Sequence, residues 1–203
     1  NLPPGDYELT ATAHAQPPEN ACGRGTPRAR ATRAFSIAED APESIDLGSV
    51  QLEQIVAVGA GDPAPVLEAT ALERDATWSL HEEVAEGKPV LLVFWASWCA
   101  PCKAEIPLIK EVWERYAERE RLQIVGINLD WDKERAVRIA QSEALPWPQY
   151  NAGAWDEDNA VTNAYCVASI PSNWLIGKDG IILADRIPAD TLHEILGDLL
   201  PKP

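Results

Sequence analysis

The sequence predicts an α/β fold with a mixed central sheet, and three observations support this prediction. The apolar runs Val90–Trp95 and Leu122–Leu129 are continuous enough to be buried parallel strands. Amphipathic helical spacing, with apolar residues three and four positions apart, follows the first of these runs. Near the C-terminus, Asp179-Gly180 separates two apolar runs, which is the strongest short-range signal for a β-hairpin. Parallel strands linked by helices and followed by a hairpin form a mixed sheet flanked by helices.

The expected strands and helices alternate along most of the chain. Strands are assigned from short apolar runs bounded by turn residues, and helices from a 3.6-residue period. Ser79 is a candidate N-cap for the first helix. In chain order we expect a strand at Val66–Leu72, a helix at Trp78–Val84, the strand Val90–Trp95, a helix that begins at the Cys99/Cys102 pair and has its apolar positions between Ile106 and Tyr116, the strand Leu122–Leu129, a helix at Asp132–Ala144, a short strand at Gln149–Tyr150, a helix at Asn159–Tyr165, a hairpin of Asn173–Ile176 with Ile181–Asp185, and a helix at Ala189–Leu200.

Residues 1–58 form a separate β-rich segment in this prediction. Apolar and polar residues alternate over Tyr7–Ala13, and Gln16–Arg33, rich in proline, glycine and arginine, indicates a long loop. The segment is either the C-terminal part of a small β-sandwich or an extended arm packed on the next domain. We expect the junction at Gly59–Pro65 and a second domain at residues 59–203. Further short alternations at Phe35/Ile37, Ile45/Leu47 and Val50/Leu52 predict short strands there as well.

The chain is strongly acidic, which excludes some classes of partner. Its 203 residues carry 32 acidic and 17 basic side chains, for a net charge of −15. Nucleic acids and anionic membranes are bound through basic patches, so neither is expected as a partner. No apolar run reaches the roughly 20 residues that span a bilayer, and no signal peptide is visible. The chain has no methionine, so we expect a processed or recombinantly trimmed product, and a signal peptide or membrane anchor upstream of residue 1 is one candidate for the missing piece.

Cys99 and Cys102 form a Cys-x-x-Cys pair between a buried strand and a helix. At a helix N-terminus the backbone N–H groups and the helix dipole favour an anion, so the first thiol ionises more readily. Cys-x-x-Cys sites lower the thiol pKa from about 8.5 to between roughly 3.5 and 7.5, and the thiolate is the nucleophile. We therefore assign Cys99 as the nucleophile and Cys102 as the cysteine that resolves the mixed disulfide.

The alternative for such a pair is half of a zinc site, which usually needs about four ligands. The other two cysteines, Cys22 and Cys166, stand alone, and the histidines His14, His81 and His193 form no cluster. The spacing favours dithiol redox chemistry, and we expect neither a metal nor a cofactor.

Three motifs together resemble a known family. They are F-W-A-S-W-C-A-P-C at Phe94–Cys102, K-A-E-I-P at Lys103–Pro107, and S-I-P-S-N-W-L-I-G-K-D-G at Ser169–Gly180. On these residues the chain resembles the thioredoxin superfamily, and within it the TlpA/ResA-like thiol-disulfide oxidoreductases of bacterial envelopes, which have a redoxin or AhpC/TSA-like domain. The resemblance covers roughly Gly59 to Leu200. It implies a thioredoxin-like fold and an extracytoplasmic enzyme of the bacterial periplasm or cell envelope.

Glu105 stands three residues after Cys102, on the helix side that faces the dithiol. The resemblance implies that a glutamate here lies near the cysteines and tunes their proton transfers, and that Pro107 kinks the helix. Ordinary thioredoxins have a buried acid six residues before the first cysteine, where this chain has Val93. Partial burial would raise the pKa of Glu105 and let it take the proton of Cys102. The alternative is a solvent-facing glutamate that only complements the helix dipole.

The resemblance also implies that the Ile170-Pro171 bond is cis and faces the dithiol. There it would offer a substrate a short strand to pair with, so Ile170 and Pro171 are expected substrate-binding residues. Trp98, Ala100 and Pro101 border the cysteines and complete the expected contact surface. Ala100 and Pro101 carry no positive charge, which argues against a strongly oxidising pair.

Four further residues are open to interpretation. Trp95 alternates with strand residues and is expected to pack, whereas Trp147 and Trp155 are candidates for the rim around the dithiol. Cys166 stands where the family usually has a small residue such as glycine. It is a buried structural thiol, a disulfide partner for Cys22, or a free thiol with a redox role. Spacing does not decide between these, because bridging needs Cα atoms within about 7 Å.

The leading hypothesis is a thiol-disulfide oxidoreductase that reduces protein disulfides and is recharged by a membrane or thioredoxin-type electron donor. The resemblance adds reduction of apocytochrome c cysteines before haem attachment as one role among several. A second enzyme class is thiol peroxidase, but such sites place a threonine where this chain has Ala96. The third hypothesis is a non-enzymatic envelope interaction module that uses the fold as a scaffold. The intact set of Cys99, Cys102 and Pro171 argues against it.

Overall fold

A computed structural model describes residues 3–13, 29–37, 53–54, 58–117, 121–156 and 159–200. The chain divides into two compact units, residues 1–57 and residues 58–203. Among the described residues, no helix combines the length and the apolar character needed to cross a membrane.

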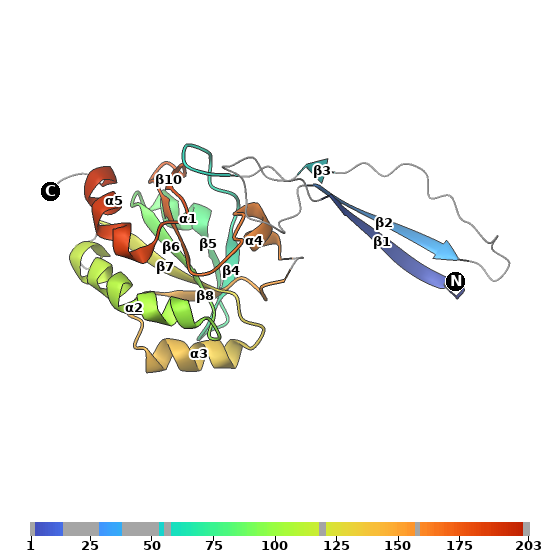
Figure 1. Cartoon of the computed structure of the whole chain (residues 1–203), viewed down its shortest axis with the longest axis horizontal. Helices are drawn as coiled ribbons and strands as arrows, with labels where there is room; N and C mark the ends of the chain where they lie inside the picture. Colours follow the sequence, from blue (N-terminus) through green and yellow to red (C-terminus); the bar gives the residue numbers. More distant parts are fainter. Residues whose placement is uncertain are drawn as a thin grey trace. The chain divides into compact units, whose positions relative to one another are not determined.

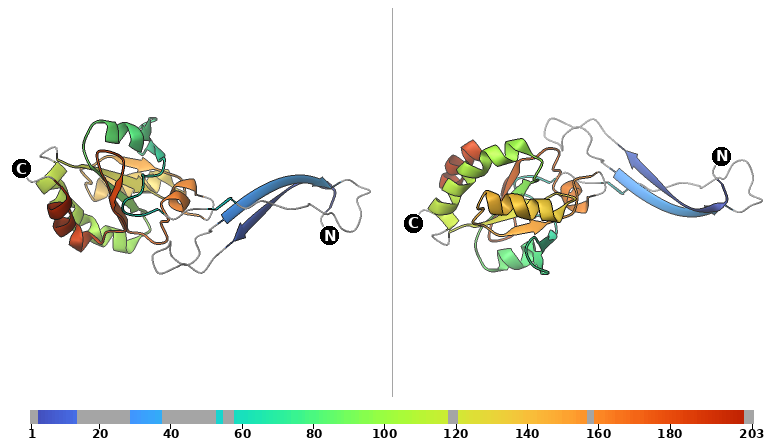
Figure 2. Two further views of the ribbon diagram at one scale, coloured as in Figure 1. Left: turned by 90° about the horizontal axis from the view of Figure 1, so that it is seen from above. Right: turned by 90° about the horizontal axis from the view of Figure 1, so that it is seen from below.

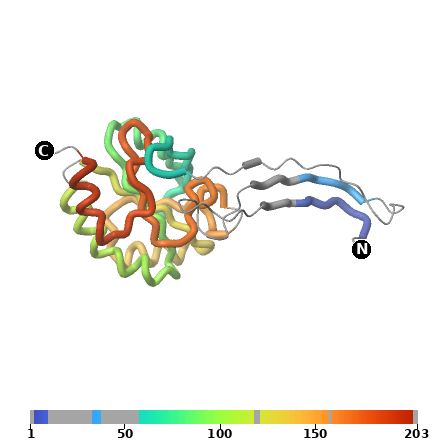
Figure 3. Tube along the Cα trace, turned by 45° about the horizontal axis from the view of Figure 1, so that its top comes forward, coloured from blue at the N-terminus to red at the C-terminus, as the bar shows by residue number. Residues whose placement is uncertain are grey.

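The first unit forms, over its described residues, a three-stranded antiparallel sheet in the order β1-β2-β3. The two long strands, β1 (Gly5–Ala13) and β2 (Ala29–Ile37), pair along their whole length, and Figure 3 traces them side by side. Tyr7 stacks on Phe35 across this pair, with ring centroids 5.6 Å apart. β3 is the short strand Glu53–Gln54.

The sequence predicts strands in this unit, with one error in their bounds. The expected loop Gln16–Arg33 overlaps β2, which starts at Ala29 because its first residues pair with the end of β1. The expected strands at Ile45/Leu47 and Val50/Leu52 lie outside the described residues. The β-sandwich interpretation and the domain boundary at residue 58 stay predictions.

The second unit is built on a seven-stranded mixed sheet in the order β10-β9-β6-β7-β8-β4-β5. β6 lies near its centre, parallel to β7 and antiparallel to β9, and β7 is parallel to β8. Every residue of β6 is buried, as expected for a strand covered on both faces. The strands are β4 (Glu68–Ala71), β5 (Thr77–Ser79), β6 (Val90–Trp95), β7 (Gln123–Asn128), β8 (Gln149–Asn151), β9 (Ser172–Ile176) and β10 (Ile182–Ala184).

Helices cover both faces of this sheet (Figure 1). α2 and α5 share one apolar cluster and lie side by side in both views of Figure 2, whereas α1 and α4 pack into a second cluster. α2 continues into the π-helical turn Trp113–Ala117, and the 3-10 turn Ala189–Thr191 leads into α5. The helices are α1 (Leu80–Ala85), α2 (Ala100–Val112), α3 (Lys133–Ser142), α4 (Ala160–Ala164) and α5 (Leu192–Leu199).

Successive residues of β6 supply the two clusters in turn. Val90, Leu92 and Phe94 belong to the cluster with α1 and α4, and Leu91 and Val93 to the cluster with α2 and α5. This follows from the alternation of side chains along a strand. The dithiol, which follows the end of β6, is therefore attached to a strand whose residues are all buried.

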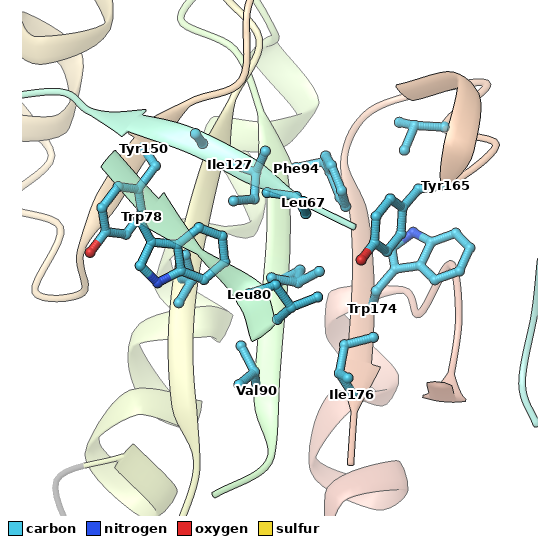
Figure 4. Packing of buried hydrophobic residues seen from close by; sticks show 14 of the residues in the cluster. Leu67, Trp78, Leu80, Val90, Phe94, Ile127, Tyr150, Tyr165, Trp174 and Ile176 are labelled. Atoms are coloured by element: carbon cyan, nitrogen blue, oxygen red, sulfur yellow. The ribbon is translucent and has the colours of Figure 1, made fainter. Parts of the chain in front are cut away.

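Aromatic rings fill the cluster beneath α1 and α4 (Figure 4). Trp78 stacks on Tyr150, with ring centroids 4.9 Å apart, and Tyr165 meets Trp174 edge-on at 5.3 Å. The Tyr165 hydroxyl donates a hydrogen bond to the Pro65 carbonyl at 2.8 Å. The polar atom of this buried ring is thus satisfied.

The predicted mixed sheet flanked by helices is confirmed, with one element shifted. Thr77–Ser79 pairs with β4 as a strand, so the helix expected at Trp78–Val84 begins only at Leu80. Ser79 occupies the N-cap position, but its side chain makes no capping hydrogen bond. The predicted hairpin of β9 and β10 is present, and Gly180 in its turn adopts φ +79°.

Candidate active site

The Cys-x-x-Cys pair sits where β6 passes into α2. After Trp95 the chain makes a tight turn, closed by a hydrogen bond from the Cys99 N–H to the Ala96 carbonyl at 3.1 Å. Cys99 is the N-cap of α2, and the Cys102 N–H donates to its Sγ at 3.1 Å. The two cysteines are disulfide-bonded, with Cα atoms 5.3 Å apart. A backbone N–H at the helix start therefore points at the first sulfur.

The loop before β9 brings a proline to the dithiol. The Ile170–Pro171 bond is cis, and the Ile170 carbonyl oxygen lies 3.7 Å from the Cys99 Sγ. The two segments meet because β9 pairs with β6, with Ser172 opposite Phe94. The cis bond and its position beside the dithiol agree with the expectation from the sequence.

Trp98 is the exposed side chain beside the two cysteines. Cys99 and Cys102 are only 4% and 5% exposed, whereas Trp98 is 49% exposed. The dipeptide Ala100-Pro101 is exposed as well. Trp155 lies against Trp98, with ring centroids 5.7 Å apart. The surface that borders the dithiol is thus apolar and partly aromatic.

Glu105 and Cys102 line the same small cavity behind the disulfide. The cavity has a volume of about 20 Å³, which is enough for one water molecule. Its lining also includes Val93, Trp147 and Pro171. A carboxyl and a sulfur that face one cavity can exchange a proton directly or through one water.

The Glu105 carboxyl is half-buried and accepts two hydrogen bonds. Asn173 Nδ2 donates to it at 3.3 Å, and the Ala189 backbone N–H is a second donor. Desolvation by burial raises the pKa of Glu105 above its ordinary value, although these donors oppose the rise; the charge of Asp190 adds to it. Glu105 is thus poised to hold or release a proton closer to neutral pH than a surface glutamate.

Four polar residues beneath the Cys99 turn are missed by the sequence reasoning. Ser97, Asn128 and Asp130 are buried, Asn151 is partly buried, and they are hydrogen-bonded to one another. One signal was available in the sequence. The segment Asn128–Asp130 lies at the carboxyl end of a predicted parallel strand, and the carboxyl ends of neighbouring parallel strands meet at one edge of a sheet, where sites form.

Trp95 is a packing residue, as expected, and its polar atom is satisfied across the sheet. Its Nε1 donates to the Gln149 Oε1 at 2.9 Å. The Gln149 side chain passes over Gly126 of β7, where an added Cβ would lie 2.0 Å from that oxygen. Glycine at this position leaves room for the contact that ties the end of β6 to β8.

Two expectations need correction. Trp147 is 3% exposed and packs against Trp113, with ring centroids 6.3 Å apart, so it lies in the core and does not line the rim. Cys166 is buried and disulfide-bonded, so it is neither a structural thiol nor a free thiol. Its φ of +51° is a conformation that glycine adopts readily, which fits the small residue expected there. Cys22, the suggested partner, lies outside the described residues.

Comparison with known proteins agrees with this geometry. The AhpC/TSA family matches residues 60–184, which include both cysteines of the dithiol. The thiol-disulfide oxidoreductase ResA of Oceanobacillus iheyensis is 28% identical over 146 residues, which cover 70% of this chain and 73% of that protein. The thiol:disulfide interchange protein CycY of Rhizobium leguminosarum bv. viciae is 32% identical over 134 residues, which cover 66% of this chain and 68% of that protein.

The fold has a solved counterpart. The thioredoxin domain of a thiol-disulfide oxidoreductase from Bacteroides vulgatus superposes with a TM-score of 0.62 at 22% identity, covering 71% of this chain and all of that domain. This similarity shows that the second unit has a thioredoxin fold. With its disulfide-bonded Cys99 and Cys102, the chain belongs to the AhpC/TSA family and is a TlpA/ResA-like thiol-disulfide oxidoreductase of the thioredoxin superfamily.

Proposed function

We propose that the protein reduces disulfide bonds in protein substrates, with Cys99 as the attacking nucleophile and Cys102 as the resolving cysteine. The observation that carries this proposal is the position of Cys99 at the N-cap of α2. There the Cys102 N–H donates to the Cys99 Sγ, and the exposed Trp98 lies beside it. A thiolate at this sulfur keeps the N–H donor and the favourable end of the helix dipole, so it forms at a lower pH than a free thiol.

The reaction takes two exchanges. The Cys99 thiolate attacks one sulfur of the substrate disulfide, forms a mixed disulfide, and releases the other substrate sulfur as a thiolate that takes a proton. Cys102 then loses its proton and attacks the Cys99 Sγ, which releases the second substrate thiol. The substrate gains two electrons and two protons, and the enzyme ends with the Cys99–Cys102 disulfide. A dithiol donor must reduce that disulfide for the next cycle.

Substrate contacts fall on the residues that border Cys99. The Ile170 carbonyl lies 3.7 Å from the Cys99 Sγ, so a substrate strand that pairs beside Pro171 brings its disulfide to that sulfur. Trp98 and the exposed Ala100-Pro101 dipeptide provide apolar contact around it. This surface suits a protein segment better than a small charged disulfide.

Glu105 accepts the proton of Cys102 during resolution and returns it when the disulfide is reduced. The shared cavity and the raised pKa of Glu105 support this role, because a base with a pKa nearer to that of a thiol transfers protons more effectively. Val93 occupies the place of the buried acid in ordinary thioredoxins and lines the same cavity. Glu105, on α2, would thus provide the proton acceptor that ordinary thioredoxins have on the strand before the first cysteine.

We place this activity outside the cytoplasm, with a membrane or thioredoxin-type protein as the electron donor. Cys166 supports the location, because it is buried and disulfide-bonded away from the dithiol, and structural disulfides persist mainly in oxidising compartments. Maturation of cytochrome c, in which cysteines must be reduced before haem attachment, is one process that would use such a reductant.

Trapping of mixed disulfides tests the roles of the two cysteines. Reduced Cys102→Ser, incubated with a synthetic disulfide-bonded peptide, should accumulate a peptide adduct on Cys99 that dithiothreitol removes. Reduced Cys99→Ser is the matched control and should accumulate none. Adducts that form on Cys102 in the control at the rate seen for Cys99, or no adduct in either variant, would contradict the assignment.

A further inference from the structure

We infer that Asp130 is a positioning residue for Cys99, acting through Ser97 in the turn that precedes the cysteine. The inference rests on the proposed role of Cys99 as the nucleophile. Asp130 follows the end of β7, which lies beside β6 in the sheet (Figure 1). It is 4% exposed, and Ser97 is 1% exposed, so their contacts are shielded from solvent.

Asp130 holds Ser97 at two points. One carboxylate oxygen, Oδ2, accepts the Ser97 backbone N–H at 2.7 Å, and the other, Oδ1, accepts the Ser97 hydroxyl at 2.7 Å. Two short bonds from one carboxylate fix both the backbone and the side chain of the same residue. Hydrogen bonds to a charged acceptor are about twice as strong as neutral ones.

Ser97 lies inside the turn that delivers Cys99 to the helix. The turn runs from Ala96 to Cys99 and is closed by the 3.1 Å hydrogen bond between these two residues. A shift of Ser97 therefore moves Cys99 relative to its two reference points. These are the Cys102 N–H at 3.1 Å and the Ile170 carbonyl at 3.7 Å.

Asp130 is itself held by a second layer of hydrogen bonds. Asn128 Nδ2 donates to the Asp130 Oδ2 at 2.6 Å, and the Asp130 N–H donates to the Asn128 Oδ1 at 3.1 Å. Asn151 Nδ2 donates to the Asn128 Oδ1 at 2.9 Å and to the Asp130 carbonyl at 3.1 Å. These bonds join the ends of β6, β7 and β8 beneath the dithiol. The Asp130 carboxylate that holds Ser97 is therefore itself fixed to the sheet.

The consequence appears in the stability of the Cys99–Cys102 disulfide. Intramolecular disulfide formation depends on how closely the two sulfurs are held, which is expressed as an effective concentration. When the Ser97 anchor is lost, Cys99 samples more positions and the effective concentration falls. The disulfide then becomes easier to reduce, and the reduction potential becomes less negative.

Asparagine at position 130 separates positioning from charge. Its Oδ1 can accept from the Ser97 N–H and from Asn128, and its NH₂ can donate to the Ser97 hydroxyl, which is both donor and acceptor. Asp130→Asn therefore keeps the anchor and loses the charge. Asp130→Ala loses both. Tyr165→Phe serves as the control for lost stability, because it removes one partly buried hydrogen bond, to Pro65, in the cluster on the other face of the sheet.

The test is the reduction potential of each full-length variant, equilibrated against defined thiol buffers. Asp130→Ala should lower the effective concentration about tenfold, which moves the potential by about 30 mV to less negative values. Asp130→Asn and Tyr165→Phe should stay within about twofold of the wild type, or about 9 mV. If the reduction potential of Asp130→Asn shifts as far as that of Asp130→Ala, the lost charge is the cause of the shift and the inference is wrong. An unchanged Asp130→Ala, or an equal shift in Tyr165→Phe, overturns it as well.

Two further measurements close the remaining gaps. If Asp130→Ala does not fold, Ser97→Ala removes one of the two bonds and should shift the potential in the same direction by about 9 mV, the equivalent of about twofold. No shift in the potential of Ser97→Ala would then overturn the inference.

The trapping experiment separates the inference from the proposed function. If Cys99 forms no mixed disulfide in Cys102→Ser, the proposed function itself is wrong. Adduct formation with unchanged potentials defeats only the role of Asp130.

Discussion

Two carboxylic side chains flank the dithiol, and the structure gives them opposite surroundings. Asp130, on the Cys99 side, is buried and accepts three hydrogen bonds of 2.6 to 2.7 Å. Glu105, on the Cys102 side, is half-buried, faces a cavity, and receives a 3.3 Å contact from Asn173 and one backbone N–H. A carboxylate that is saturated with donors fixes geometry. One with few donors and adjoining space can change its protonation state, so the number of partners separates the two roles.

The largest difference between the two carboxylates should be in stability. Asp130→Ala leaves the Ser97 N–H, the Ser97 hydroxyl and the Asn128 amide without their acceptor in a buried site. We expect a loss of about 3 kcal/mol in the free energy of unfolding. Glu105→Ala should cost less than about 1 kcal/mol, because the carboxyl is only half-buried and its bond from Asn173 is long, at 3.3 Å. Urea unfolding of the oxidised proteins checks both values. Equal losses in Asp130→Ala and Glu105→Ala would contradict the different roles assigned to the two carboxylates.

For the rate of catalysis we expect the reverse order of the two carboxylates. A substitution of Glu105 that keeps the shape of its side chain should have the larger effect. Glu105→Gln removes the proton acceptor from the Cys102 cavity, so we expect the resolution step to slow by about 10²-fold near neutral pH. The loss should shrink at alkaline pH, where Cys102 ionises without help. Stopped-flow release of the second substrate thiol measures this step.

The matched control for that experiment is Glu111→Gln, on the same helix but exposed and paired with His193. This variant should keep the wild-type rate. If Glu105→Gln slows resolution no more than Glu111→Gln does, or slows it equally at all pH values, Glu105 is not the proton acceptor.

A smaller loss of stability is expected at Gly126, which leaves room for the hydrogen bond between Trp95, at the end of β6, and Gln149. In Gly126→Ala the new Cβ would lie 2.0 Å from the Gln149 Oε1, so Gln149 must move away and release the Trp95 Nε1. We expect a loss of about 1 to 2 kcal/mol in the free energy of unfolding. Tryptophan fluorescence should report the altered Trp95. Gly87→Ala is a poor control because of its positive φ, whereas Gly197→Ala, in open space on α5, should cause no loss and gain up to about 1 kcal/mol, because alanine favours a helix over glycine.

The smallest effect is a pH dependence of stability that belongs to Glu105. The folded state raises the pKa of Glu105 above its ordinary value of 4.5, so the folded protein binds this proton more tightly than the unfolded chain does. Stability from this residue is therefore fullest below pH 4.5 and declines as the pH rises from there through the folded-state pKa. Glu105→Gln should lack this decline. A difference between the two unfolding curves that does not change with pH would contradict the raised pKa.

The sequence was sufficient for the fold of the second unit because its signals are local. Val90–Trp95 is continuously apolar because β6 is buried on both faces, and Asp179-Gly180 marks the hairpin because the turn needs a positive φ. The strand at Thr77–Ser79 was missed because its pairing with β4 is a tertiary contact that overrides a helical pattern. The core position of Trp147 was missed for a similar reason, since burial against α2 leaves no local trace.

The residues of the active site also fall into two groups, those that the sequence predicts and those that it does not. Cys99 and Cys102 stand in one contiguous motif, and Ile170-Pro171 in another, so both are visible in the sequence. Asp130 is 33 residues from Ser97 and carries no motif, and only the parallel pairing of β6 with β7 brings them together. Residues that perform the chemistry are therefore easier to predict than residues that hold them in place.

The most direct test of the central claim, that this dithiol is a reductant, is the reduction potential of the wild-type Cys99–Cys102 pair in defined thiol buffers. Neither Ala100 nor Pro101 adds a positive charge that would stabilise the thiolate beyond the effect of the helix. We therefore expect a value near that of thioredoxin, about −270 mV. A value near about −120 mV, as in the strong periplasmic oxidant, would contradict the account and make the protein a donor of disulfides.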